Sequence, residues 1–193
     1  MINVFVDVET SGLDPKTCSI VQLGYIITQD GNEVESGSFK LKPFFGEPLS
    51  EIAKEKTGLT DEEVANYPDQ SIAYKEFINI LNKYIPIGDY ANKGFFTGYN
   101  ASFDMDFCRQ WFIRNGNNLF GYYFHYPYLD VMSLAALSLI PERYKMRNFQ
   151  LVTVYQKVTG KTLFNAHDAL ADIRATKEIY DCLIRRMYKI PTR

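Results

Sequence analysis

Two carboxylates stand close together near the start of the chain, inside a run of apolar residues. Asp7 and Glu9 belong to the segment VFVDVETSGL, which otherwise has the composition of a buried β-strand. Because side chains alternate across a strand, residues at i and i+2 project from the same face. Two like charges side by side repel each other, and divalent metal is the physical reason to gather oxygen ligands in this way.

Other acidic residues stand at places from which they can reach the same point. Asp104 follows a predicted strand and lies near the start of a predicted helix, and Asp172 lies one turn into the last predicted helix. Since sequential elements of an α/β layer lie side by side, these two carboxylates can converge with Asp7 and Glu9. Four carboxylates carry a total charge of about −4, which two Mg²⁺ ions offset. Two such ions roughly 3.5–4 Å apart can bind a phosphodiester between them.

A histidine immediately before the last helix supplies a candidate general base. His167 and Asp172 are five residues apart, about 140° around a helix, so both cannot face one point from a single helix. The conflict disappears if Asp168 is the N-cap and His167 belongs to the preceding loop. An imidazole titrates near neutral pH and can remove a proton from an attacking water. Asp168 lies on nearly the same helix face as Asp172 and remains an alternative metal ligand.

The elements that must position these residues follow a mixed α/β pattern. Residues 2–42 are predicted to form a three-stranded meander, and residues 94–100 a fourth strand. An aromatic strand or loop over 120–128 leads into a helix. A hairpin-rich beginning followed by alternating helices and strands predicts a mixed sheet with helices packed on it, in one domain over residues 1–193. The other helices are expected between 49 and 67 (two short ones, divided by Gly58 and Thr60) and over 70–85, 102–115, 147–159 and 168–188.

Composition and charge exclude several classes of protein. The chain has 193 residues, 46% of them hydrophobic, and no apolar run near the ~18 residues of a membrane span. It begins directly in a predicted strand without the features of a signal peptide, and its three cysteines fit neither a disulfide framework nor a zinc site. We therefore expect a cytoplasmic protein without a membrane partner.

The signals for nucleic-acid contact are local. The net charge of −2 gives no global basic signature, so a polyanion would have to meet a metal or a local basic patch. The basic stretches at 143–148 and 185–193 are equally compatible with phosphate contacts and with solvated surface. The aromatic run at 120–128 is predicted to supply core residues and a few exposed tyrosines rather than a stacking platform for bases.

Three motifs, in this order, resemble the DEDD superfamily of 3′–5′ exonucleases in its histidine-containing branch, which includes the proofreading subunit of bacterial DNA polymerase III and RNase T. The first is DVETSGL, from Asp7 to Leu13. The second is NASFDMDF, which begins at Asn100, and the third is His167 followed five residues later by Asp172. The motifs extend over nearly the whole chain, and their combination is far more specific than any one of them.

The resemblance implies a ribonuclease-H-like α/β fold, with a mixed five-stranded sheet whose second strand is antiparallel, flanked by helices. It also implies hydrolysis of a 3′-terminal nucleotide with two Mg²⁺ ions, for which Mn²⁺ is expected to substitute. The metal ligands would be Asp7, Glu9, Asp104 and Asp172, and His167 would be the base. The residues around the terminal nucleotide would be Thr10, Gly12, Leu13, Asn100 and Phe103.

The expected function is a metal-dependent exonuclease that releases nucleoside 5′-monophosphates from single-stranded 3′ ends, with DNA favoured over RNA. An RNA-trimming or oligoribonuclease-type exoribonuclease would use the same chemistry. A non-catalytic module that binds nucleic acid or a polymerase is the third alternative, although such a module has no reason to tolerate the repulsion among the acids. A polymerase and a second copy of the chain are the candidate protein partners.

Overall fold

The computed structural model describes residues 1–164 and 166–188. Its centre is a five-stranded sheet in the order β3-β2-β1-β4-β5. The strand β1 is antiparallel to β2 and parallel to β4, so the predicted mixed sheet with an antiparallel second strand is confirmed. The strands are β1 (Ile2–Thr10), β2 (Ile20–Gln29), β3 (Asn32–Lys40), β4 (Gly94–Gly98) and β5 (Leu129–Asp130).

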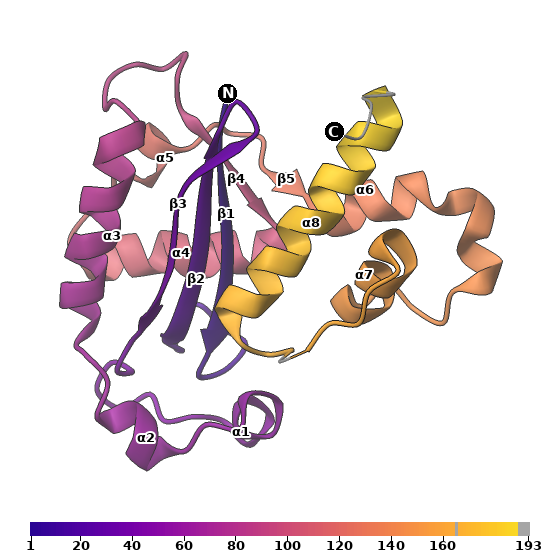
Figure 1. The fold of residues 1–193 in the computed structure, drawn as a ribbon. Helices are drawn as coiled ribbons and strands as arrows, with labels where there is room; N and C mark the ends of the chain where they lie inside the picture. The colour runs from indigo at the N-terminus through magenta and orange to yellow at the C-terminus, as the bar shows by residue number, and fades with distance from the viewer. Residues whose placement is uncertain (165, 189–193) are drawn as a thin grey trace.

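Helices cover the sheet on both faces (Figure 1). Two short helices, α1 and α2, precede α3 and lie at the end of the sheet where β1 finishes. The last helix, α8, runs across β1 and β2. The helices are α1 (Glu51–Thr57), α2 (Asp61–Ala65), α3 (Gln70–Tyr84), α4 (Ala101–Arg114), α5 (Phe120–Tyr123), α6 (Val131–Ser138), α7 (Leu151–Thr159) and α8 (Ala169–Tyr188), with a 3₁₀ helix at Ile140–Lys145.

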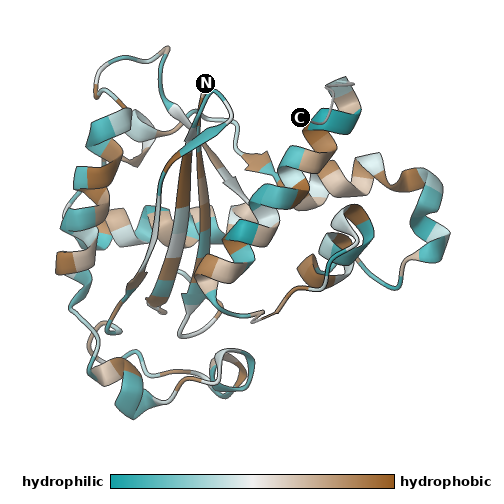
Figure 2. Ribbon diagram, viewed as in Figure 1, coloured by the Kyte–Doolittle hydropathy of each residue, from teal (hydrophilic) through white to brown (hydrophobic). Residues whose placement is uncertain are grey.

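The two faces of β1 are buried by different helices. Val4 and Val6 pack in a cluster with Trp111 of α4, whereas Phe5 on the other face packs with Ile173 of α8. Figure 2 shows hydrophobic colour along the central strands and alternating hydrophobic and hydrophilic colour along the helices around them. A strand buried on both faces is a rigid support, and it carries Asp7 and Glu9 near its C-terminal end.

Two predicted elements differ in detail from the structure. The fifth strand is two residues long, and the aromatic run before it, expected as a strand or loop, begins with a single helical turn, α5. The helix expected over 147–159 begins at Leu151, since the Asn148 side chain accepts hydrogen bonds from the Gln150 N–H and the Thr153 hydroxyl and folds the preceding residues into a turn. Neither difference moves a candidate site residue.

The aromatic run supplies both core residues and exposed tyrosines, as predicted. Phe120, Tyr123 and Phe124 are buried, whereas Tyr122, Tyr126 and Tyr128 are exposed. Among the helices of the described residues, none combines the length and the hydropathy that crossing a bilayer requires.

Candidate active site

The site lies at the C-terminal end of β1, where α8 begins. Asp7 pairs with Gly24 of β2, and a Cβ atom on Gly24 would lie 2.4 Å from the Ala169 carbonyl oxygen. Glycine in a strand interior permits this close approach of another backbone. The absence of a side chain at Gly24 therefore lets the first turn of α8 lie directly against the sheet and brings Asp172 to the edge that carries Asp7.

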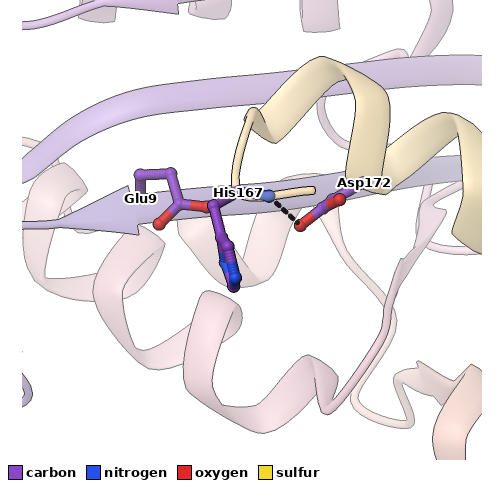
Figure 3. Close-up of side chains that lie close together, drawn as sticks. All are labelled: Glu9, His167 and Asp172. Carbon is purple, nitrogen blue, oxygen red and sulfur yellow. Dashed lines mark hydrogen bonds between the residues drawn. The ribbon is translucent and has the colours of Figure 1, made fainter. Parts of the chain in front are cut away.

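The start of α8 has the predicted geometry. The Asp168 carboxylate accepts a hydrogen bond from the Ala171 N–H at 3.0 Å, so Asp168 caps the helix. His167 precedes the cap in a left-handed conformation with φ of 73°, and its backbone N–H donates to the Asp172 carboxylate at 3.1 Å (Figure 3). The cap and this backbone bond together fix the loop that carries the imidazole.

Three chemically active side chains meet at this point. Glu9 comes from β1, whereas His167 and Asp172 come from the loop and the first turn of α8 (Figure 3). One ligand atom from each of the three lies within 4.8 Å of the others. Asp172 is buried and His167 is exposed, so the cluster opens to solvent on the histidine side.

The second motif reaches the cluster through α4. The Asp104 side chain is buried, and its Oδ1 accepts a hydrogen bond from the Val8 N–H at 3.0 Å. Val8 lies between Asp7 and Glu9 in β1, so this bond holds the Asp104 carboxylate beside both of them. Burial raises the pKa of Asp7 most, and the negative charges of Asp104 and Asp172 raise it further, as expected for acids gathered from three distant segments.

Burial and mutual repulsion make these acids difficult to ionise. Burial, followed by the charges of Asp172 and Asp104, raises the pKa of Glu9 to about 8. Burial also raises the pKa of Asp104 to about 7, against the effect of the Val8 hydrogen bond. The Asp7 pKa is raised well above its usual range by burial and by the neighbouring carboxylates. Such shifts are typical of sites that hold a cation or perform acid–base chemistry.

The residues present fit divalent metal. Carboxylate oxygens are the ligands that Mg²⁺ and Mn²⁺ prefer. One oxygen of Asp172, Oδ1, is buried and has no hydrogen-bond partner among the described residues. A buried acceptor without a donor costs free energy unless a ligand satisfies it. A cation among these carboxylates would satisfy that oxygen and remove the repulsion.

The raised pKa values predict how stability depends on pH in the metal-free protein. A carboxyl group whose pKa is higher in the folded state binds its proton more tightly there, so the free energy of unfolding falls as pH rises between the two pKa values. For Glu9 this window runs from 4.5 to about 8. We expect the melting temperature of metal-free protein to fall between pH 5.5 and 8.5, and saturating Mg²⁺ to restore it most at pH 8.5. Calorimetric scans with and without Mg²⁺ check this, and a melting temperature that is level or rising without metal would contradict it.

The residues expected around a terminal nucleotide separate into two neighbouring depressions. A small hollow of about 90 Å³ is lined by Glu9, Thr10, Gly12, Leu13, Lys56 and Phe103. A large cleft of about 700 Å³ is lined by Lys56, Tyr99, Asn100, Phe149, His167 and Asp172. The structure therefore brings Thr10, Gly12, Leu13 and Phe103 together in the hollow, and it places Asn100 in the cleft that His167 and Asp172 line.

Asp130 organises the second motif without joining the acids. Its carboxylate accepts hydrogen bonds from the Asn100 N–H at 2.9 Å and from the Met132 N–H at 3.2 Å, so it caps α6 and fixes the turn before α4. Asn100 has a φ of 62° in that turn. The contact to Asn100 joins segments thirty residues apart in the chain, and no local signal in the sequence indicates it.

The basic stretches are partly engaged in structural contacts. Arg143 donates to the Met146 carbonyl at 2.6 Å, and Arg186 donates to the Val158 carbonyl at 2.9 Å. The first bond is local to the end of the 3₁₀ helix, and the second ties α8 to α7. The end of the second stretch, residues 189–193, lies outside the described residues.

Comparisons with known proteins identify the family of the chain. An exonuclease family model, that of RNase T, matches residues 4–180. The PolC-type DNA polymerase III of Thermotoga petrophila is 31% identical over 187 residues, which are 97% of this chain and 12% of that protein. The 3′–5′ DNA exonuclease Cap18 of Escherichia coli is 30% identical over 184 residues, which cover 93% of this chain and 89% of that protein.

The fold agrees with a solved structure. Exonuclease I of E. coli, in complex with a dT13 oligonucleotide, superposes with a TM-score of 0.78 at 24% identity, over 97% of this chain and 42% of that one. The family model, the relatives and the fold confirm the resemblance that the three motifs indicated. The chain belongs to the RNase T family of exonucleases.

Proposed function

We propose that this chain is a metal-dependent 3′–5′ exonuclease that releases nucleoside 5′-monophosphates from single-stranded DNA. The observation that carries the proposal is the meeting of Glu9, His167 and Asp172 at one solvent-accessible point, beside Asp104 and Asp7. The family match supports the reaction class. We further propose that residues 1–193 form a single exonuclease domain, since the family model extends over most of them.

In this proposal the four carboxylates Asp7, Glu9, Asp104 and Asp172 hold two Mg²⁺ ions. Bound there, the ions would stabilise the charge on the attacking and leaving oxygens of the phosphodiester. The protein contributes rigidity, because Glu9 and Asp7 stand on a strand buried on both faces and the Val8 N–H orients Asp104. Rigid support matters because a site that is 1 Å too loose loses much of its effect.

His167 is the proposed general base. A ring nitrogen of His167 accepts a proton from the water that attacks phosphorus, and the backbone bond to Asp172 holds the loop while it does so. The exposed position of His167 lets that proton pass on to solvent between turnovers. The terminal nucleotide occupies the small hollow against Leu13 and Phe103, and the preceding nucleotide lies in the large cleft.

DNA is the proposed substrate because Cap18, which this chain matches over nearly its full length, is a DNA exonuclease. The relatives named PolC-type DNA polymerase III make a DNA polymerase the candidate protein partner. The chain spans 12% of the PolC-type proteins of Thermotoga, so their wider activities are not transferred to it.

Matched single strands of DNA and RNA, labelled at the 5′ end, test the direction and the substrate together. We expect a ladder that shortens from the 3′ end in Mg²⁺, with the DNA strand degraded faster. A strand whose 3′ end is blocked is the control and stays intact. Faster degradation of RNA would replace the DNA assignment with the exoribonuclease, and cutting of the blocked strand would contradict an exonuclease.

A further inference from the structure

One cation stands at the boundary between the two depressions. The side chain of Lys56 lines both the small hollow and the large cleft. Among the described residues that line either depression, Lys56 is the one lysine or arginine, whereas Glu9 and Asp172 supply negative charge. A chain of nucleotides that passes from the cleft into the hollow therefore passes Lys56.

The helix that carries Lys56 is attached to the first motif. The Ser50 N–H donates to the Ser11 carbonyl at 2.8 Å, and the Ser50 hydroxyl caps α1 by accepting from the Ala53 N–H. At the other end, Gly58 adopts a φ of 71° and ends the helix. The position of α1 beside β1 is thus fixed by the backbone, and the position of Lys56 follows from it.

The ammonium group of Lys56 is available to a ligand. Ala53, Lys56 and Thr57 lie at i, i+3 and i+4 and all line the small hollow, so they share one face of α1. Lys54 points elsewhere and forms ion pairs with Glu51 at 3.1 Å and Asp61 at 2.9 Å. Within the described part of the chain, no carboxylate lies within ion-pair distance of Lys56. Burial and the neighbouring acids raise the pKa of Glu9, and the positive charge of Lys56 opposes that rise, as expected for an ammonium group close to Glu9.

We propose that Lys56 binds the phosphate that joins the nucleotide in the small hollow to the nucleotide in the large cleft. This inference rests on the proposed function, since it places the 3′-terminal nucleotide in the hollow. The phosphate in question is the one that is cleaved. A lysine ammonium is a compact charge suited to a phosphate oxygen, and its attraction increases as negative charge develops there during hydrolysis.

Two substrates and three variants test the proposal. The substrates are a 3′-labelled single-stranded oligodeoxynucleotide and the p-nitrophenyl ester of thymidine 5′-monophosphate, which keeps the reacting phosphate and lacks every other one. Lys56→Met removes the charge, Lys56→Arg retains it, and Lys54→Met is the control on the same helix with the same change in net charge. Thermal melting of each variant separates a contact with substrate from a loss of folding.

We expect Lys56→Met to lower kcat/KM about tenfold to a hundredfold, by the same factor on both substrates, with the melting temperature unchanged. Lys56→Arg should recover most of the activity, and Lys54→Met should stay within about twofold of the wild type. With the oligonucleotide, the slope of log kcat/KM against log salt should flatten by about 0.7 in Lys56→Met, as for the loss of one phosphate contact on a single strand.

The outcomes separate this inference from the proposed function. If the wild type hydrolyses both substrates and Lys56→Met does so equally well, the role of Lys56 is wrong and the exonuclease stands. A defect confined to the oligonucleotide would mean that Lys56 contacts a different phosphate, and it would overturn the assignment to the reacting one. If the wild type hydrolyses neither substrate, the exonuclease proposal itself fails.

Discussion

Asp104→Asn is expected to lower the rate of 3′-end hydrolysis on the order of a thousandfold or more while leaving the fold intact. The asparagine retains an oxygen that can accept the Val8 N–H, now 3.0 Å from Asp104 Oδ1, so β1 and α4 keep their connection. The change removes one negative charge from the proposed metal-binding set, and metal ions supply several kcal/mol of transition-state stabilisation in such sites. Single-turnover hydrolysis of a 3′-labelled oligodeoxynucleotide measures the loss.

The melting temperature of Asp104→Asn distinguishes a loss of catalysis from a loss of folding. Burial raises the pKa of Asp104 to about 7, so at pH 8 the metal-free protein holds a mostly ionised carboxylate whose burial lowers the free energy of unfolding. We therefore expect metal-free Asp104→Asn to melt at the same temperature as the wild type or higher at that pH. Asp106→Asn, an exposed substitution two residues along the same helix, is the matched control and should keep wild-type activity. Wild-type activity in Asp104→Asn would exclude Asp104 from the reaction.

His167→Asn is expected to reduce kcat by a factor of about a hundred to ten thousand, the usual contribution of a positioned general base. Asparagine tolerates the left-handed backbone that His167 adopts, with φ of 73°, so the loop before α8 keeps its shape. The amide cannot accept the proton of the attacking water. Rapid-quench measurement of a single turnover isolates the chemical step from product release.

Metal affinity distinguishes the base from a metal ligand. A nitrogen of His167 lies within 4.8 Å of oxygens of Glu9 and Asp172, close enough that the imidazole itself could be a ligand. If His167 is the base, the Mn²⁺ affinity of His167→Asn stays close to that of the wild type while the rate falls. Equal losses of affinity and rate would assign His167 to the metal. His125→Asn is the control, because His125 is the only other histidine of the chain and its ring packs against that of Phe95, with ring centroids 4.5 Å apart.

Much of the site can be predicted from the sequence because its residues occupy local structures with clear signals. An acid pair inside an apolar strand, an aspartate in the first turn of α4 and a cap before α8 can each be recognised without tertiary information. The relation between His167 and Asp168 also follows from helix geometry alone, and the structure has the same cap. The neighbours β3, β2 and β1 follow from the meander predicted over residues 2–42, whereas the strand signals do not state where β4 and β5 join the sheet.

The features of the site that the sequence does not predict depend on contacts between distant segments. Gly24 has no chemistry of its own, and only the approach of the Ala169 carbonyl to β2 explains why a side chain would not fit there. The sequence does show that Gly24 stands within the second predicted strand, and an isolated glycine there indicates a bulge or the close approach of another backbone. Nothing in the sequence marks Lys56 as a binding residue, because a lysine in an exposed short helix is usually solvated. Its place between the two depressions depends on the attachment of α1 to Ser11.

The central claim is that the acids gathered at the end of β1 act through divalent metal, and one titration tests it most directly. Metal-stripped protein is mixed with a 3′-labelled single-stranded oligodeoxynucleotide in EDTA, and Mg²⁺ is then added in steps until it exceeds the chelator. The account predicts no release of labelled nucleoside 5′-monophosphate before free Mg²⁺ appears and a saturable rise afterwards. Release at the full rate in excess EDTA would contradict the account.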